Sequence, residues 1–158
     1  MRYRIEALAG HERSGFASGS HAPDRYFREQ VTQDIRRRVA TCLVGLDEAN
    51  EVAGYYTLSS SSVGLNELPA EYARKLPRYP SVPATLMGRL AVAKTHTGRG
   101  LGSALLADAL HRAAHSGIAT YALLVDPKDE GAARFYEHFG FERLTSARRM
   151  FHALGGIP

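Results

Sequence analysis

The sequence has little of what disulfide-bonded, thiolate-zinc or membrane-spanning proteins need. Its 158 residues include one cysteine, Cys42, which excludes an internal disulfide and a zinc site made of several thiolates. No segment approaches the roughly 18 uninterrupted apolar residues of a membrane span. The first residues, MRYRIEALAG, also lack the apolar block of a secretion signal. We therefore expect a cytoplasmic protein with no membrane segment, in which Cys42 is a small buried side chain.

The composition fits one folded domain with a modest positive charge. Hydrophobic residues make up 44% of the chain, and there is no repeat or low-complexity tract. We therefore expect a single domain over residues 1–158. The chain has 20 lysines and arginines against 16 aspartates and glutamates, an excess that favours a polyanionic partner.

Part of the positive charge falls on a predicted helix over residues 23–39. Phe27, Val31, Ile35 and Val39 recur every four residues and form an apolar stripe. A neighbouring face carries three arginines, which are Arg25, Arg28 and Arg36. This face has two interpretations, a phosphate-binding surface or a solvated face whose last arginines interact with the helix dipole.

Alternating and apolar runs predict strands at six places along the chain. They are residues 2–8, 40–46, 52–65, 85–93, 120–127 and 141–154, the last segment forming one or two strands. Further helices are predicted within residues 95–117 and 129–140, and four prolines limit residues 65–83 to a short helix and a stiff connector. The order strand, helix, strand, helix, strand in the second half indicates a sheet with a parallel crossover pair at its centre.

The segment THTGRGLGSALLADAL, residues 95–110, places three glycines at the start of a predicted helix. A helix N-terminus has unpaired N–H groups and a partial positive charge, and glycines let an anion approach that backbone. A Walker A loop is excluded because no lysine follows Gly100 or Gly102. A dinucleotide fingerprint is excluded because Ser103 or Leu105 occupies the place of its last glycine. The spacing that fits is Thr-x-x-Gly-x-Gly from residue 97.

This spacing resembles the pyrophosphate loop of the GNAT N-acetyltransferases, with threonine at residue 97 where that family has glutamine or arginine. The segment DEGAARFYEHFGF, residues 129–141, is similar to a second motif of the family, with aspartate at 129 in place of the common asparagine. The resemblance is strongest over residues 84–145. It implies an α+β (mixed α/β) GNAT fold, with a central, mostly antiparallel sheet of about six or seven strands, a splayed parallel pair and about four flanking helices.

The same resemblance implies acetyl-CoA as the cofactor. The residues that it assigns to acetyl-CoA are Leu90, Ala91, Val92, Thr97, Gly98, Arg99, Gly100, Leu101, Gly102, Ser103, Asp129, Ala132 and Phe135. A backbone N–H near Val92 is expected to polarise the thioester carbonyl. Tyr136, in the Phe-Tyr pair of the second motif, is the expected general acid. A phenol with a pKa near 10 is protonated at neutral pH and can donate to a thiolate whose thiol has a pKa near 8.5.

Within that family, the chain resembles the acetyltransferase toxins of type II toxin–antitoxin systems, of the TacT and AtaT type. The similar segments are VAGYYTLSSSSV, the spaced prolines, MGRLAV and YFREQVTQDIRRRVATCLVG, whereas alanine stands at residue 93 where these toxins often have aspartate. The resemblance implies acetylation of the α-amine of aminoacyl-tRNA, which stops translation. It also implies a cognate ribbon-helix-helix antitoxin and operator DNA bound only through the antitoxin complex. A homodimer is a further possible assembly.

The substrate amine explains why no strong general base is evident. An α-amino group has a pKa near 8, against about 10.4 for lysine, so it is substantially neutral in the cell. A tRNA acceptor stem would need a basic cleft, with an affinity that falls steeply with salt. The residues expected to bind this substrate are Arg89, Arg25, Arg28 and Arg36.

Two other functions stay open, and no metal is expected. The chain could be a GNAT acetyltransferase of small-molecule amines or protein amino groups, or a non-catalytic module that binds acetyl-CoA or a partner protein. His111 and His115 are four residues apart, but HRAAH lacks the glutamate of a zinc peptidase and shares its face with Asp108 and Arg112. We interpret this pair as part of a solvated polar face.

Overall fold

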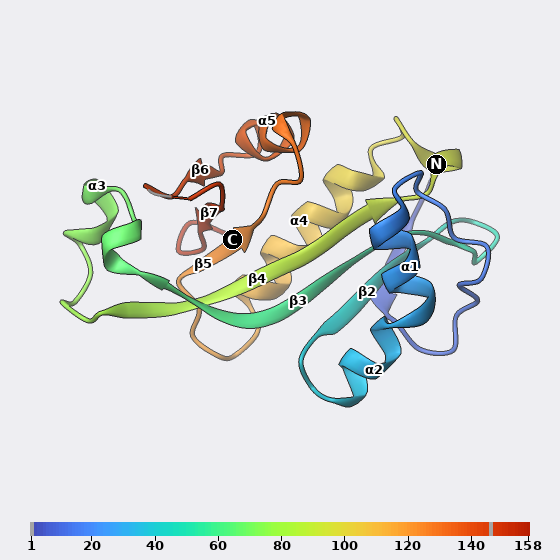
Figure 1. Cartoon of the computed structure of the whole chain (residues 1–158), viewed down its shortest axis with the longest axis horizontal. Helices are drawn as coiled ribbons and strands as arrows, with labels where there is room; N and C mark the ends of the chain where they lie inside the picture. Colours follow the sequence, from blue (N-terminus) through green and yellow to red (C-terminus); the bar gives the residue numbers. More distant parts are fainter. Residues whose placement is uncertain (1, 146) are drawn as a thin grey trace. The chain divides into compact units, whose positions relative to one another are not determined.

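The computed structural model describes residues 2–145 and 147–158, and Figure 1 shows their strands and helices. The strands are β1 (Arg4–Ala7), β2 (Thr41–Leu46), β3 (Val52–Gly64), β4 (Ser81–Val92), β5 (Ala122–Val125), β6 (Glu142–Arg143) and β7 (Met150–Ala153). The helices are α1 (His21–Glu29), α2 (Val31–Arg36), α3 (Ala70–Ala73), α4 (Leu101–Ala114) and α5 (Glu130–His138), with short 3-10 turns η1 (Leu65–Glu67) and η2 (Lys94–His96). None of the helices in these ranges has the length and apolar character to cross a membrane.

The strands belong to one sheet in the order β1-β2-β3-β4-β5-β7-β6. β4 and β5 run parallel, whereas β2 pairs antiparallel with β1 and β3, and β7 pairs antiparallel with β5 and β6. The predicted α+β fold with a mostly antiparallel sheet and one parallel pair is thereby confirmed. The Cα atoms group into two compact units, residues 1–59 with 88–109 and residues 60–87 with 110–158. The single domain expected over residues 1–158 stays a prediction.

In the first unit, β2 and β3 are consecutive antiparallel strands, and β1 pairs antiparallel with the other edge of β2. Thr41 lies opposite Leu58 where β2 begins. At the other end of β2, the Asp47 carboxylate stabilises the turn into β3, because its Oδ1 accepts hydrogen bonds from the N–H groups of Ala49 and Glu51 at 2.9 and 3.0 Å. An aspartate here therefore satisfies two N–H groups of the turn.

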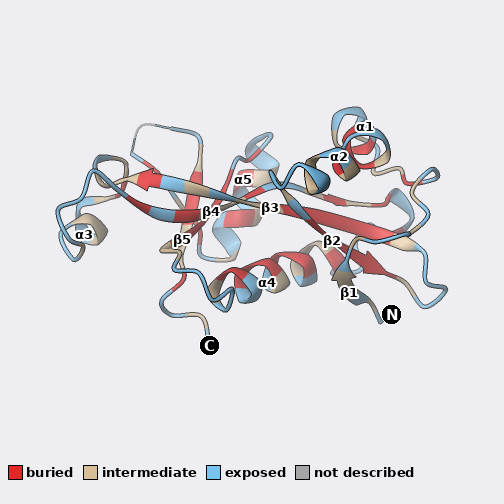
Figure 2. Ribbon diagram, turned by 90° about the horizontal axis from the view of Figure 1, so that it is seen from below, coloured by how far each residue is buried: buried red, intermediate tan, exposed pale blue. Residues whose placement is uncertain are grey.

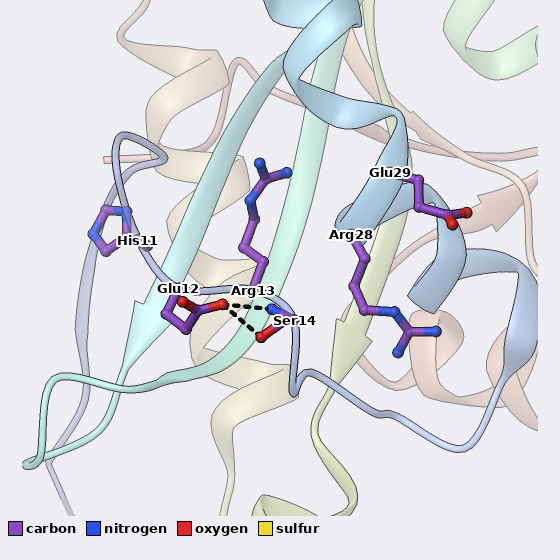
Figure 3. A pocket seen from close by; sticks show the side chains of 6 residues that line it. All are labelled: His11, Glu12, Arg13, Ser14, Arg28 and Glu29. Carbon is purple, nitrogen blue, oxygen red and sulfur yellow. Dashed lines mark hydrogen bonds between the residues drawn. The ribbon is translucent and has the colours of Figure 1, made fainter.

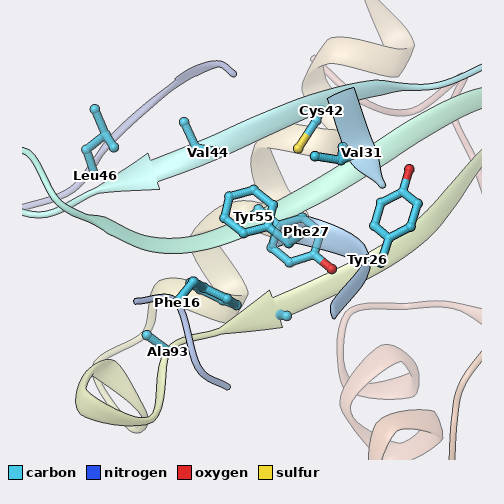
Figure 4. Close-up of a cluster of buried hydrophobic side chains, with 10 residues drawn as sticks. Phe16, Tyr26, Phe27, Val31, Cys42, Val44, Leu46, Tyr55 and Ala93 are labelled. Carbon is cyan, nitrogen blue, oxygen red and sulfur yellow. The ribbon is translucent and has the colours of Figure 1, made fainter. Parts of the chain in front are cut away.

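Aromatic side chains form the core of the first unit (Figure 4). Phe27 stacks on Tyr55 with ring centroids 4.3 Å apart, and Phe16 packs edge-on against both rings at 5.0 and 5.6 Å. The Tyr55 hydroxyl donates to the Pro23 carbonyl at 2.6 Å, which satisfies its polar end. Cys42 belongs to the same cluster, and burial raises the pKa of its thiol to about 12. It is the buried side chain that the sequence predicts.

The predicted single helix over residues 23–39 is wrong, because the chain forms two helices there. Gln30 separates α1 from α2 with a φ of −120° and a ψ of −30°, outside helical geometry. The first two residues of the apolar stripe are fully buried, but Val39 lies beyond α2 and is 57% exposed. Arg38 takes a left-handed backbone conformation, with a φ of 62°, and the chain leaves the helix there. Ile35 still packs against the core, so the apolar stripe holds for its first three residues and fails only at the last.

Two glycines let α4 lie close to β2 and β3. Gly45 faces Gly54 across the two strands. A Cβ atom on Gly45 would lie 3.1 Å from a methyl carbon of Leu101, and one on Gly54 would lie 3.0 Å from both the Ala91 carbonyl oxygen and a methyl carbon of Leu105. Both leucines are buried, on the buried face of α4 that Figure 2 shows in red. The contact between helix and sheet therefore depends on the absence of side chains at these two positions.

In the second unit, β5 is buried along its whole length, as its apolar sequence predicts. The connector before β4 is shorter than expected, because β4 begins at Ser81 and includes Pro83. A proline is tolerated there since its carbonyl still pairs, accepting from the Tyr121 N–H at 2.7 Å. The Tyr72 hydroxyl, from α3, donates to the Glu142 carboxylate of β6 and so connects that short helix to the sheet.

We predict that Gly54→Ala lowers the free energy of unfolding by about 1–3 kcal/mol, because the added methyl group would press on a backbone oxygen and a leucine that cannot both move away. Urea denaturation followed by circular dichroism measures the change. Gly15→Ala is the matched control, since a Cβ there meets no atom within 4 Å. Equal stability of the Gly54→Ala and Gly15→Ala variants would contradict the prediction.

Candidate functional site

The glycine segment forms an exposed turn that opens α4. Gly98 and Gly100 have φ angles of +79° and +82°, which strongly favour glycine, and neither position is crowded. The first helical bond runs from the Ala104 N–H to the Gly100 carbonyl at 3.0 Å. The N–H groups of Leu101 to Ser103 therefore precede the intrahelical ladder. Such a turn can bind an anion through the backbone, as the sequence predicts.

Buried contacts hold the chain on both sides of this turn. On the helical side, Leu101 is 1% exposed and packs beneath the glycine pair of the sheet. On the strand side, His96 is buried, and its Nδ1 lies 2.8 Å from the Tyr3 hydroxyl oxygen. The His96 Nε2 lies 3.3 Å from Oδ2 of Asp47. The backbone N–H of Glu51, with other donors to the same carboxylate, holds the pKa of Asp47 below its usual value. The turn is thus an exposed segment between two anchored ends.

Two departures from the family motifs have local structural explanations. The Thr97 hydroxyl lies 3.4 Å from the Ala93 carbonyl and donates to it, so this side chain stabilises its own turn. Ala93 is buried in the aromatic core, and its N–H donates to the Ala53 carbonyl at 2.7 Å. A small apolar side chain at residue 93 fits that environment, whereas a carboxylate there would be buried.

The residues assigned to acetyl-CoA from the end of β4 differ in exposure. Ala91 is 6% exposed, whereas Leu90 and Val92 on either side of it are half-buried. The carbonyl of Ala91 is the backbone oxygen that a side chain at Gly54 would approach. The glycine pair therefore also fixes the position of the strand end that precedes the turn.

In the second unit, Asp129 begins α5 as its N-cap. The backbone of Asp129 is extended, and its Oδ1 accepts a hydrogen bond from the Ala132 N–H at 2.8 Å. Aspartate and asparagine cap helices equally well through a side-chain oxygen, so the aspartate found here does the work of the usual asparagine. Ala132 and Phe135 follow on α5 and are half-buried.

Tyr136 lies on the buried face of α5. Its side chain is 8% exposed, and its ring centroid lies 5.4 Å from those of both Phe135 and Phe141. Burial, together with the negative charge of Asp126, raises the pKa of the Tyr136 phenol to about 12. The phenol is therefore protonated throughout the physiological range and can act only as a proton donor there.

Arg149 is a residue of this neighbourhood that the sequence analysis missed. Its guanidinium binds the Asp126 carboxylate with both oxygens, through Nε at 2.7 Å and Nη2 at 2.9 Å. Asp126 follows directly after β5, and the polar residue after a buried strand was the available signal. The partner could not be found in the sequence because Arg149 is 23 residues away along the chain.

The four arginines expected to bind substrate have different environments in the first unit. The Arg89 guanidinium carbon lies 3.5 Å from the centroid of the Tyr26 ring, a cation–π contact that leaves the arginine exposed. Arg25 is exposed and forms an ion pair with Glu29 at 2.8 Å. Arg36 is exposed at the end of α2.

Arg28, the fourth of these arginines, is used by the fold. Its Nη1 donates to the Phe16 carbonyl at 2.6 Å and holds the loop before α1. A hollow of about 370 Å³ lies beside it, lined by the side chains in Figure 3, which are His11, Glu12, Arg13, Ser14, Arg28 and Glu29. Arg13 is similarly engaged, because it donates to the Phe27 carbonyl at 2.7 Å and to the Thr32 hydroxyl at 2.8 Å. Since both cations already have acceptors and two of the six lining residues are glutamates, we assign no ligand to this hollow.

His111 of α4 and His115, the residue after that helix, are exposed, as expected of a solvated face. Their rings stack with centroids 4.3 Å apart, and Nδ1 of His115 lies 2.8 Å from the His111 carbonyl. Within residues 2–145 and 147–158, no group of three or more histidine, cysteine, aspartate or glutamate side chains is arranged to hold a metal ion.

The sequence and the structure of this chain are similar to those of known proteins. Residues 5–141 match the model of the family described as the acetyltransferase (GNAT) family. A tRNA-acetylating toxin of Mycobacterium tuberculosis (strain ATCC 25618 / H37Rv) is 37% identical over 131 residues, which cover 82% of this chain and 77% of that protein. A crystal structure of a KacT mutant has a TM-score of 0.91 at 26% identity, covering 99% of this chain and 98% of the other.

A structure of AtaT complexed with acetyl-methionyl-tRNAfMet is also similar, with a TM-score of 0.90 at 25% identity, covering 99% of this chain and 97% of the other. The two motifs, the sheet order with its parallel pair, and a family match over most of the sequence all agree. The chain belongs to the acetyltransferase (GNAT) family.

Proposed function

We propose that this chain transfers the acetyl group of acetyl-CoA to the α-amine of aminoacyl-tRNA and thereby blocks translation. The observation that carries the proposal is the exposed turn before α4, where two left-handed glycines lead into a helix N-terminus. The relative described as a tRNA-acetylating toxin supports this choice of substrate. The similarity to AtaT complexed with acetyl-methionyl-tRNAfMet supports it as well.

In this proposal, the first unit binds the cofactor mainly through its backbone. The N–H groups of residues 99–103 donate to the pyrophosphate of acetyl-CoA, and Thr97 and Gly98 shape the turn that presents them. Acetyl-CoA supplies the acetyl thioester. The strand end formed by Leu90, Ala91 and Val92 offers further backbone groups, and the Val92 N–H donates to the thioester carbonyl. Because these donors are part of the backbone, substitutions act on them only by changing the shape of the turn.

Residues of α5 complete the proposed machinery. Tyr136 donates its proton to the departing coenzyme A thiolate, a role that its raised pKa supports because the phenol stays protonated. Asp129 contributes by capping α5, and Ala132 and Phe135 present an apolar surface to the cofactor. The substrate needs no strong base, since an α-amine with a pKa near 8 has a far larger neutral fraction near pH 7 than a lysine with a pKa near 10.4.

The proposed contacts with tRNA are electrostatic. Arg89 and Arg36 are exposed, and Arg25 is exposed beside one carboxylate, so these three can contact phosphates. Arg28 has a hydrogen bond to the backbone and would contribute through its charge. We also propose that a cognate ribbon-helix-helix antitoxin covers these four arginines. Operator DNA is bound only through that complex, and the chain can form a homodimer. The resemblance to the acetyltransferase toxins supports these partners.

We predict that Tyr136→Phe lowers kcat for acetyl transfer to charged tRNA by about 100-fold, because the proton for the thiolate is lost, and leaves the dissociation constant for acetyl-CoA unchanged. Labelled acetyl-CoA with total charged tRNA measures the transfer, and calorimetry measures cofactor binding. Cells that express the unaltered chain should stop growing, whereas cells that express the Tyr136→Phe variant should grow. Tyr121→Phe, which removes a hydroxyl from another partly buried tyrosine of the same unit, is the control. A Tyr136→Phe variant with full activity would remove Tyr136 from the mechanism.

We predict that Gly100→Ala weakens acetyl-CoA binding about tenfold, because an alanine would have to hold a φ of +82° at a cost of roughly 1–2 kcal/mol or distort the turn. Gly117→Ala is a matched control, with a φ of +83° and open space around it, beyond the other end of α4. Both variants should lose similar stability, and only the first should lose affinity in a calorimetric titration. Equal affinities would mean that the turn does not bind the cofactor.

The raised pKa of Tyr136 predicts the alkaline limb of the rate profile. The value of kcat/KM for charged tRNA should rise as the substrate amine loses its proton near pH 8, and it should then stay level to pH 10. The reason is that the phenol, with a pKa of about 12, keeps its proton over this range. A phenol at its ordinary pKa near 10 would be about half ionised at pH 10. Initial rates, corrected for spontaneous hydrolysis of the aminoacyl ester, test this, and a twofold fall between pH 9 and 10 would refute it.

A further inference from the structure

The segment that joins α3 to β4 carries an exposed aromatic side chain among exposed cations. Tyr79 is 63% exposed, and it alone among the phenylalanine and tyrosine side chains of the described ranges is exposed. Arg74, Lys75 and Arg78 are exposed beside it in the sequence. We call these four residues the α3–β4 basic surface. Figure 1 shows α3 and the turn that leads from it into β4.

The cations of this surface have no carboxylate partners in the structure. Within residues 2–145 and 147–158, no ion pair or side-chain hydrogen bond engages Arg74, Lys75 or Arg78. In the same unit, Arg143 and Arg149 both bind acidic side chains. The sequence around this surface also has more positive than negative residues, since residues 68–107 contain six lysines and arginines and one glutamate. Unpaired exposed charge of one sign attracts a partner of the opposite sign.

The α3–β4 basic surface is held in a fixed shape. Pro77 and Pro80 restrict the backbone on either side of Tyr79, and the Tyr79 N–H donates to the Pro77 carbonyl at 2.8 Å. The Pro80 carbonyl accepts from the Leu65 N–H at 3.2 Å, and the Leu76 side chain packs against the buried cluster of the second unit. Because the segment is already ordered, little conformational entropy is lost when a ligand binds to it.

We propose that the α3–β4 basic surface binds single-stranded nucleic acid, with a base stacked on the Tyr79 ring and phosphates on Arg74, Lys75 and Arg78. An exposed flat ring beside unpaired cations is the combination that single strands recognise, because every base has a stacking face and every nucleotide a phosphate. An acidic peptide would use the cations and gain little from the ring. The identity of the strand as part of a tRNA rests on the proposed function, whereas the surface itself does not.

Binding of a fluorescent single-stranded RNA of about 12 nucleotides, followed by anisotropy over a range of salt concentrations, tests the proposal. The variant with Arg74→Ala, Lys75→Ala and Arg78→Ala should bind at least about tenfold more weakly at low salt. Its affinity should also depend less on salt, with a slope of log K against log salt that is shallower by about two. Tyr79→Ala should also bind about tenfold more weakly but keep the salt slope, and Tyr79→Phe should bind normally, since the ring face is retained.

A matched control removes the same charge elsewhere. The variant with Arg2→Ala, Arg4→Ala and Arg143→Ala also loses three positive charges from exposed positions and should bind the RNA nearly as the unaltered chain does. If this control lost as much affinity for the RNA as the Arg74, Lys75 and Arg78 variant does, net charge alone would explain the effect and the proposal would be overturned. It would also be overturned if Tyr79→Ala left RNA affinity intact while polyglutamate bound through the same three cations, because the surface would then be one for an acidic protein.

This experiment separates the α3–β4 basic surface from the catalytic proposal. RNA binding is measured with uncharged RNA and without acetyl-CoA, whereas transfer is measured with charged tRNA. Binding that depends on Tyr79 without any acetyl transfer would refute the proposed function alone. Acetyl transfer with RNA binding insensitive to all four residues would refute this inference alone.

Discussion

The close contact of α4 with β2 and β3 is the constraint on which the glycine turn before α4 depends. The glycine pair at residues 45 and 54 removes two side chains from the sheet face, and Leu101 and Leu105 fill the space. Leu101 is the first residue of the helix, so the buried contact begins where the exposed N–H groups begin. A turn with left-handed glycines would be mobile in isolation, because glycine has the largest conformational entropy of any residue. Here, buried residues on both sides hold it.

Solvation affects the exposed turn and the buried phenol in opposite ways. An anion bound to backbone N–H groups keeps part of its solvation, and the donors are neutral dipoles that cost little to leave in water. Tyr136 is removed from water, which disfavours the ionised phenolate and raises its pKa. The neighbouring Asp126 has the same effect through its charge, and the two hydrogen bonds from Arg149 keep that carboxylate in place. The phenol is thus kept protonated mainly by burial.

The sequence predicts the local features of this protein better than its long-range contacts. The glycine turn is encoded within a few residues and is found where the sequence places it, and the turn at Asp47 and the cap at Asp129, which the structure adds, are equally local. The break between α1 and α2 was missed because the apolar spacing continues through Gln30. The pairing of Asp126 with Arg149 was missed for a related reason, since spacing along the chain carries no information about strands brought together by the sheet.

The arginines show why net charge is a poor guide to a binding surface. Arg13 and Arg28 donate to backbone carbonyls, and Arg149 is committed to a carboxylate, so these side chains serve the fold although they add to the formal charge of +4. The strongest attraction for a polyanion comes from the smaller set of exposed cations that the fold has left without acceptors. A cation already bound to a carboxylate releases little new energy on meeting a phosphate, because one charged partner is exchanged for another. Unpaired cations beside an exposed ring therefore identify a nucleic-acid surface more reliably than a run of arginines in the sequence.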